Sequence, residues 1–379
     1  MRILHVGGAA SRAELTRLTG LNRSTIGALT TDLASVGLVR EGAPVGNGVG
    51  RPSIVVAPNS TKVYALAFDV RVERTVAAVV GLGGVVLGRR EVHHPRRATP
   101  PEEVVAEIAA LGRECMGEMP AGAICVGVGL AVPGVVRSHD GLVRFAPNMG
   151  WVDVPLAEML GRALATSLPI IVGNDADFGA ISEHVRGAAA GADNIIFLSG
   201  EVGVGGGIIL GGRLMVGAGG YGGEIGHMVV NPDGRPCRCG RTGCWETEIG
   251  EDAVLSELGG RPGDELDDLL PPHSEGTPPP ELPRVGRWLG IGLANLVNIF
   301  NPEVVVFGGL LGRVFPLIGE HLREQFDTAL VAPREQVRLA LPTLGHDSPL
   351  LGAAEAVFGP LLDDPLSRFS RAHAAVAPA

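Results

Sequence analysis

The chain has 379 residues, of which 45% are hydrophobic and 19% are charged, enough for two or three domains with a large core. No apolar run reaches the ~18 residues that a membrane span requires, and the first residues lack the apolar segment of a signal peptide, so we expect no membrane span. The net charge of −10 excludes a uniformly basic nucleic-acid binder, but residues 1–58 carry six arginines against three acidic residues, an asymmetry typical of a small DNA-binding module fused to an acidic body.

Residues 1–58 are predicted to form a winged helix-turn-helix domain. Ser11 followed by Glu14 is a capping box that starts a helix, and Asn22 can cap a second helix after a glycine turn. Four apolar residues at helical spacing are expected to form the buried face of the second helix: Ile26, Leu29, Leu33 and Val36. Residues 39–56 then read as two short strands around a Gly-rich tip, the wing. A small helical protein-interaction module is the alternative, since any helical hairpin gives a similar signal.

The second helix of this head is predicted to lie in the major groove of double-stranded DNA. The residues expected to contact base edges and phosphates lie on the side of this helix opposite its buried face, with one arginine on the flank: Ser24, Gly27, Ala28 and Thr31, and Arg23 on the flank. Arg51, which follows the wing tip, is expected to enter a narrow minor groove. One head of this size would bind DNA weakly, so a homodimer or tetramer is expected.

From residue 59 onward, strands and helices alternate, which predicts an α/β architecture. Strands are expected at residues 64–70, 75–80, 85–92, 123–130, 169–172, 194–198, 204–210 and 303–309. Helices are expected at residues 101–119, 154–166, 176–189 and 284–300. Residues 362–379 are Ala/Pro-rich and are predicted to be a frayed tail.

Five polar residues lie where buried segments end: Asn148, Asp175, Glu224, His227 and Glu246. Carboxylates and amides are the acceptors that the paired hydroxyls of a sugar need. Each of these residues alone is more often an exposed turn residue, and Asp175 could simply cap the helix that follows it.

Residues 223–246 hold a histidine and three cysteines between tight Gly and Pro turns: His227, Cys237, Cys239 and Cys244. This Cys3His set predicts a closed, tetrahedral, structural Zn2+ site. A disulfide from Cys237 or Cys239 to Cys244, or cysteines that are only small buried hydrophobes, are the alternatives. Metal-type cysteines without disulfide partners fit the reducing cytoplasm, where we expect the protein to reside.

The same stretch carries a family resemblance. Gly-Glu-Ile-Gly-His at residues 223–227 and Cys-Arg-Cys-Gly-Arg-Thr-Gly-Cys-Trp-Glu at residues 237–246 resemble the signature of the ROK family of bacterial sugar kinases and sugar-responsive repressors. Residues 11–39, with Gly-Arg-Pro at 50–52, are similar to the head of ROK repressors, which stand-alone ROK kinases lack.

The resemblance implies an actin-like (ribonuclease H-like), two-lobed fold, with residues 59–174 and 349–361 in a first lobe and 175–348 in a second lobe that carries the zinc. It also implies a sugar in the cleft between the lobes, with Asn148 and Asp175 on one side of the ring and the remaining three polar residues on the other. His227 would bind zinc through one ring nitrogen and a sugar hydroxyl through the other.

In ROK kinases the position of Asp175 is the general base, but both phosphate-binding loops of that family are altered here. In the kinases the first loop has a sequence like Asp-x-Gly-Gly-Thr. In this chain the corresponding residues, 69–74, are Asp-Val-Arg-Val-Glu-Arg. The second loop reads Gly-Thr-Gly in the kinases and Gly-Glu-Val-Gly at residues 200–203. Side chains at these positions would block the approach of backbone amides to phosphate, and the carboxylate of Glu201 would repel it. We therefore expect no catalytic residue and no enzymatic activity.

These features together predict a DNA-binding repressor whose sugar effector closes the cleft and moves the heads off their half-sites. An ATP-dependent sugar kinase with a vestigial head, or a sensor that binds another protein, are the alternatives.

Overall fold

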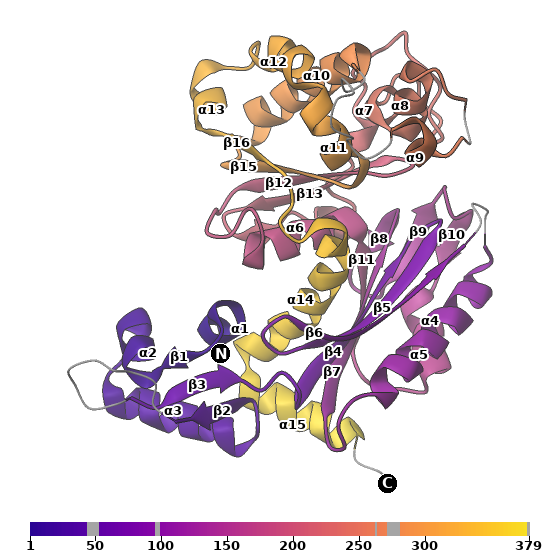
Figure 1. Cartoon of the computed structure of the whole chain (residues 1–379). Coiled ribbons are helices and arrows are strands. Elements are labelled where there is room, and N and C mark those ends of the chain that lie inside the picture. Colours follow the sequence, from indigo (N-terminus) through magenta and orange to yellow (C-terminus); the bar gives the residue numbers. More distant parts are fainter. Residues whose placement is uncertain (44–52, 95–98, 262–263, 271–280, 377–379) are drawn as a thin grey trace. The chain divides into compact units, whose positions relative to one another are not determined.

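The computed structural model describes residues 1–43, 53–94, 99–261, 264–270 and 281–376 (Figure 1). The chain forms two compact units. The first comprises Met1–Val132, Val136–Gly173 and Ala353–Ala379, and the second comprises Pro133–Val135 and Asn174–Gly352. The limits predicted for the head and for the two lobes stay predictions. Among the helices of the described ranges, none is both long and apolar enough to cross a membrane.

The head lies in the first unit and has the predicted helix-turn-helix with a small sheet. Its elements are α1 (Arg2–Gly7), β1 (Ala10–Ser11), α2 (Arg12–Thr19), α3 (Arg23–Ser35), β2 (Val39–Gly42) and β3 (Val55–Pro58). The strands pair antiparallel in the order β1-β3-β2. The amide of Glu14 donates to the Ser11 hydroxyl at 3.1 Å, and the amide of Thr25 donates to Asn22 Oδ1 at 2.8 Å, so both predicted helix starts are confirmed.

The core of the head is built from five buried apolar residues: Leu4, Leu15, Ile26, Val39 and Val56. The prediction that Leu29 joins this core is wrong, because the Leu29 side chain is 46% exposed. The buried stripe of α3 runs through Ile26 and Thr30, which are one turn apart, and Leu29 falls beside it.

The rest of the first unit is built on a five-stranded sheet in the order β11-β7-β4-β5-β6. Its strands are β4 (Val63–Val70), β5 (Arg74–Gly81), β6 (Val85–His93), β7 (Ile124–Val132) and β11 (Ile170–Asn174). One face packs against α4 (Pro101–Gly117) and α5 (Leu156–Leu164). A short sheet of β8 (Val135–Arg137), β9 (Leu142–Ala146) and β10 (Trp151–Val154) follows β7 in the chain.

The second unit holds another five-stranded sheet, in the order β14-β13-β12-β15-β16. Its strands are β12 (Ile195–Gly200), β13 (Val204–Leu210), β14 (Arg213–Leu214), β15 (Val304–Gly308) and β16 (Arg338–Ala340). Successive side chains of β12 point to opposite faces, so Phe197 packs against α6 (Asp175–Arg186) while Ile196 and Leu198 pack against α10 (Pro283–Phe300). The sheet is thus enclosed between two helical layers, the second completed by α7 (Trp245–Ile249), α8 (Glu251–Glu257), α9 (Leu266–Leu269), α11 (Gly309–Val314), α12 (Gly319–Phe326) and α13 (Val331–Gln336).

All strands and helices predicted for the body are present, with ends shifted by a few residues. The prediction of a frayed tail is wrong for residues 362–376. Helix α14 (Ser348–Asp363) is followed by α15 (Pro365–Val376), in which Phe369 and Ala372 are buried. Alanine favours a helix as much as it favours a loose end, and α15 packs against β7, which supplies the burial that local sequence does not reveal.

Candidate metal centre and sugar site

The four predicted metal ligands are brought together by a short 3-10 helix, Ile225–His227, and by the loop that follows it. The loop folds back on itself, since the amide of Val230 donates to the Gly243 carbonyl at 3.0 Å and the amide of Cys237 to the Arg241 carbonyl at 2.7 Å. Gly243 has φ 75°, and a Cβ there would lie 1.6 Å from the Asn231 carbonyl oxygen, so only glycine fits the turn before Cys244.

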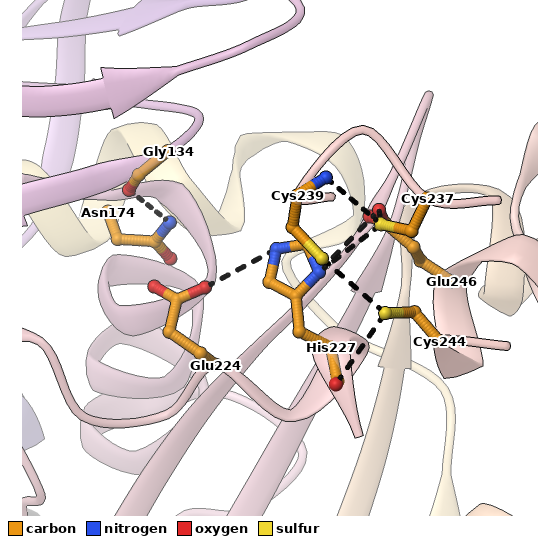
Figure 2. A network of polar contacts seen from close by, with 8 residues as sticks. All are labelled: Gly134, Asn174, Glu224, His227, Cys237, Cys239, Cys244 and Glu246. Carbon is orange, nitrogen blue, oxygen red and sulfur yellow. Dashed lines mark hydrogen bonds and ion pairs between the residues drawn. The ribbon is translucent and has the colours of Figure 1, made fainter. Parts of the chain in front are cut away.

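The ligand atoms of His227, Cys237, Cys239 and Cys244 all lie within 4.8 Å of one another (Figure 2). Cys239 Sγ and Cys244 Sγ are 3.6 Å apart, and Cys237 Sγ is 3.7 Å from His227 Nδ1. Around a tetrahedral zinc with bonds of ~2.3 Å, neighbouring sulfurs lie roughly 3.8 Å apart. All the cysteines are free thiols, which contradicts the disulfide alternative. The geometry of the cluster therefore suggests a metal site.

The ring of His227 has the metal ligands on one side and an acidic residue on the other (Figure 2). Its Nδ1 faces the sulfurs, and its Nε2 lies 3.9 Å from Glu224 Oε2. Glu246 Oε1 lies 3.6 Å from Nδ1 and 2.8 Å from Cys237 Sγ. Burial raises the pKa of Glu224, with His227 opposing that rise and Glu246 adding to it. The second unit thus brings together three of the residues predicted to bind sugar: Glu224, His227 and Glu246.

Asp175 is buried and begins α6, directly after β11. The cap of this helix is the preceding residue, because Asn174 Oδ1 accepts from the amides of Ala176 and Asp177 at 2.8 and 3.2 Å. The alternative that Asp175 is merely a cap is therefore not supported. Asn174 Nδ2 in turn donates to the Gly134 carbonyl at 3.0 Å (Figure 2). Asn148, the fifth predicted sugar residue, is half-buried in the turn between β9 and β10 of the first unit.

Asp177 is a carboxyl group that the sequence reasoning missed, although it lies in the same Asn-Asp-Ala-Asp motif as Asp175. It is half-buried in the first turn of α6. Burial, and then the charges of Asp175 and Glu224, raise the pKa of Asp177 from the ordinary 3.8 to about 7. This shift connects Asp175 electrostatically to the group around His227 within the second unit.

The shift of Asp177 predicts a pH dependence of stability. Because the folded chain holds this proton more tightly than the unfolded chain, the stabilising effect is complete below about pH 4 and is lost as the pH rises through about 7. Between about pH 6 and pH 8, the Tm of the metal-loaded wild type should fall roughly 3 °C more than that of Asp177→Asn. Scanning calorimetry of both proteins checks this, and equal falls would contradict the proton on Asp177.

The run of glycines in β13 has a packing role. A Cβ on Gly207 would lie 2.3 Å from the Ala176 carbonyl oxygen in α6, and one on Gly206 would lie 2.1 Å from Ile225 Cδ1. Both glycines allow the sugar-site elements to approach the sheet closely. Their presence is thus explained by the position of α6 and of the 3-10 helix, without a phosphate.

The first altered loop is closed by ion pairs. Asp69, at the end of β4, is 1% exposed and accepts a hydrogen bond from Arg71 Nε at 2.9 Å. Arg74 Nη2 lies 3.6 Å from the same carboxylate oxygen, and Arg74 Nη1 lies 3.5 Å from Glu91 Oε1. The amide of Arg71 donates to the Arg74 carbonyl at 2.8 Å, which makes the loop a tight turn. The guanidinium group of Arg71 thus occupies the position of the first glycine in the kinase motif that this loop resembles, and the guanidinium group of Arg74 follows directly after that motif.

The second altered loop is also a tight turn, since the amide of Glu201 donates to the Gly203 carbonyl at 2.9 Å. The Glu201 carboxylate lies over Gly309, where a Cβ would meet Glu201 Oε1 at 2.9 Å. A negative charge therefore lies at the junction of β15 and α11.

In the head, Arg23, Ser24, Ala28 and Thr31 are exposed on α3. Gly27 is half-buried, and a Cβ there would lie 3.7 Å from Arg12 Nη1. Arg12 also donates to Thr31 Oγ1 at 3.2 Å and forms an ion pair with Glu41. Arg12 therefore adjoins the predicted DNA face, which no local pattern indicates because its partners Thr31 and Glu41 lie on α3 and β2. Arg51 lies outside the described residues.

The sequence model described as "ROK family" matches residues 65–358 of this chain. The chain belongs to the ROK family. The xylose repressor of Bacillus spizizenii is 30% identical over 361 residues, which cover 93% of this chain and 92% of that protein. The glucokinase of Streptomyces coelicolor is also 30% identical, over 313 residues that cover 76% of this chain and 96% of that protein.

The similar solved structures also include both a transcriptional regulator and a kinase. A ROK family transcriptional regulator, described as a homologue of the E. coli MLC protein, has a TM-score of 0.73 at 24% identity, covering 96% of this chain and 95% of that one. A ROK glucokinase from Streptomyces griseus, in complex with glucose and AMPPNP, has a TM-score of 0.64 at 27% identity, covering 77% and 98%. The predicted two-lobed ROK fold is confirmed. The xylose repressor of Bacillus spizizenii is matched over 92% of its length and 93% of this chain. This extent places the present ROK protein in the transcriptional-regulator branch.

Proposed function

We propose that this ROK protein is a sugar-responsive transcriptional repressor. It binds double-stranded operator DNA through its head and a sugar effector through its body. The observation that carries the proposal is the extent of similarity: a repressor is matched over 93% of the chain, whereas a glucokinase is matched over 76%. The ROK family model begins at residue 65, after the head, whose α3 presents exposed polar residues at the positions expected to meet DNA.

The proposed effector is a pyranose, with D-xylose and D-glucose as the first candidates because relatives are named a xylose repressor and a glucokinase. Asp175, Glu224, His227 and Glu246 are proposed to bind its hydroxyls from the second unit, and Asn148 is proposed as a further contact. The metal is proposed to be Zn2+ with a structural role, since three thiolates and one imidazole fill a tetrahedral shell without leaving a position for water. Held through Nδ1, the ring of His227 would keep Nε2 available for a sugar hydroxyl.

We further propose that the protein has no kinase activity and acts as a homodimer or tetramer. The side chains of Arg71 and Arg74 are held on Asp69 in a tight turn, where they would block the approach of backbone amides to phosphate, and Glu201 adds a negative charge at the second loop, so both loops oppose a triphosphate. A head of this size needs a second copy to reach a specific affinity, and operator half-sites would then reflect the symmetry of the dimer.

The test is operator binding with and without sugar. Duplexes are selected from a random pool with the zinc-loaded protein, and the Kd for the selected duplex is measured by fluorescence anisotropy. D-xylose or D-glucose should raise this Kd about 5–150-fold, the usual range of coupling between two sites. A duplex Kd that no sugar changes would contradict a sugar-responsive repressor.

Similarity to glucokinases gives the kinase alternative an observation of its own, so Mg-ATP is added in parallel. We expect the thermal shift caused by sugar to be the same with and without Mg-ATP, and no ADP release. Sugar-dependent ADP release would replace the repressor proposal with the kinase.

The head makes a separate prediction about DNA. Arg23 is the exposed first residue of α3. Arg23→Ala should weaken binding to every duplex by roughly 5–10-fold and should lower the slope of log Kd against log salt by ~1, because one phosphate contact is lost. The matched control is Arg213→Ala, an exposed arginine of β14 in the second unit, which should leave the affinity and the slope unchanged. An unchanged slope for Arg23→Ala would remove it from the DNA interface.

A further inference from the structure

A buried histidine connects the head to the rest of the first unit. His5 of α1 is 0% exposed, and its Nε2 lies 2.9 Å from Oε2 of Glu355 in α14. Its Nδ1 accepts from the amide of Gly83, in the turn between β5 and β6, at 2.9 Å. The ring also packs at 5.0 Å from the ring of Phe358. Three contacts to the body thus converge on one side chain of the head.

The partners fix which nitrogen carries the proton. A backbone amide can only donate, so Nδ1 must accept from Gly83 and Nε2 must carry the hydrogen that Glu355 accepts. Glu355 is only 6% exposed, so removal of the imidazole would take away one hydrogen-bond donor from a carboxylate that water can hardly reach. The contact is therefore specific in geometry and costly to break.

Two adjacent residues of helix α1 are buried in different places, one in the core of the head and one against the body. Leu4 is part of the core of the head, with Leu15 and Ile26. The next residue, His5, is held by the body. Because the two residues are adjacent on a six-residue helix, α1 cannot move relative to α14 without either breaking the His5 contacts or pulling Leu4 from the core of the head. Figure 1 shows α1 beside α14.

Helix α14, which carries Glu355, also contacts α6, the helix that begins at Asp175. Helix α14 begins at Ser348, whose hydroxyl donates to Glu183 Oε1 at 2.7 Å. Glu183 is fully buried in α6, the helix that begins at Asp175. One continuous helix therefore carries a partner of α6 at its first residue and the partner of His5 two turns further on, at its middle. A change in α6 on sugar binding has a packed route along α14 to the head.

We propose that His5 is the positioning residue that couples the head to the effector-binding body. The proposal rests on the proposed function and adds the contact through which the sugar acts on DNA affinity. With the contact intact, a shift of α14 moves α1 and the core of the head together. Without it, the head keeps other contacts with the body, such as the hydrogen bond from Asn59 Nδ2 to the Gly37 carbonyl at 3.1 Å, but its buried contact with Glu355 of α14 is lost and its DNA affinity no longer depends on the sugar.

Four variants test the coupling. His5→Ala and Glu355→Ala remove the contact, whereas Glu355→Gln keeps an acceptor at the same place and should restore coupling. The matched control is Arg2→Ala, which breaks the exposed ion pair between Arg2 and Asp363, at 2.7 Å, on the same two helices. For each protein the Kd for the selected duplex is measured with and without saturating D-xylose or D-glucose, and the sugar Kd is measured by calorimetry.

In His5→Ala and Glu355→Ala, we expect the effect of sugar on the duplex Kd to fall from the wild-type 5–150-fold to less than ~2-fold, with the sugar Kd and the sugar-free duplex Kd within ~3-fold of wild type. Arg2→Ala and Glu355→Gln should keep the wild-type response. A wild-type response in His5→Ala, or a sugar Kd that changes as much as the coupling, would overturn the proposal. A wild type that binds sugar without any change in duplex Kd would instead overturn the proposed function.

A readout without sugar or DNA covers variants that fold poorly. The Gly83 amide loses its acceptor in His5→Ala, so its hydrogen exchange should speed up ~10-fold or more, while amides of α3 in the head keep the wild-type rate. Unchanged exchange at Gly83 would show that His5 does not hold the body. Faster exchange throughout α3 would show that His5 only stabilises the head, which also overturns the coupling.

Discussion

Replacing Cys244 with serine should remove the bound metal and destabilise the second unit. Cys244 is fully buried and precedes Trp245, whose indole Nε1 donates to the Trp288 carbonyl of α10 at 2.8 Å. The loop is therefore tied to the main helix of this unit through the residue after the ligand. Structural zinc contributes several kcal/mol to folding, so the loss should lower the Tm by roughly 10 °C. The metal content of the purified variant and its melting curve provide the two measurements.

The matched control is Cys115→Ser. Cys115 is also fully buried, but it lies in α4 of the first unit, where its Sγ donates weakly to the Ala77 carbonyl. This variant should keep one equivalent of metal. Full metal content in Cys244→Ser would contradict the ligand set, and loss of metal in both variants would mean that the metal is bound elsewhere or nonspecifically.

Asp175→Asn should weaken sugar binding by roughly 100-fold and leave sugar-free DNA binding unchanged. The carboxylate would accept hydrogen bonds from two sugar hydroxyls, and an amide loses the charge that makes such bonds strong. The substitution keeps the shape and an oxygen that can accept from the Ala176 amide, now 3.0 Å from Asp175 Oδ1, so α6 should begin as before. Titration calorimetry with sugar and anisotropy with the selected duplex measure the two affinities.

Asp252→Asn is the matched control for Asp175→Asn. Asp252 is an exposed acidic residue in the first turn of α8, in the same unit. It should bind sugar as the wild type does. Equal losses of sugar and DNA affinity in Asp175→Asn would mean that Asp175 holds the fold and does not contact the effector.

The metal cluster could be predicted from sequence because its geometry is local. Cys237, Cys239 and Cys244 lie within eight residues, separated by Gly240 and Gly243, and both glycines adopt the positive φ that the spacing requires. The helix caps at Ser11 and Asn22 are local in the same sense, since each cap is made with a residue three positions ahead. Patterns of this range decide the structure almost without tertiary help.

Contacts between distant segments could not be predicted in this way. His5 and Glu355 are 350 positions apart, and either residue alone reads as an ordinary polar residue of a helix. The role of Arg12 was hidden for the same reason, because its partners lie on α3 and β2. Leu29 shows the converse, since helical spacing gave four candidates for a buried face and the small core of the head left Leu29 exposed.

The closed loop at Asp69 has a consequence for how such a regulator reports sugar. A kinase converts the sugar that it binds into a phosphate ester, so the fraction of kinase with bound sugar depends on turnover and on the supply of ATP. On the proposed absence of kinase activity, a body whose Asp69 is paired with its own Arg71 and Arg74 would return the sugar unchanged. On the proposed function, its occupancy is then an equilibrium reading of sugar concentration alone. The fraction of protein with bound sugar would then fall again on dilution, and no ATP would be consumed. At equal sugar concentration, this fraction would be the same in a starved cell as in a well-fed one.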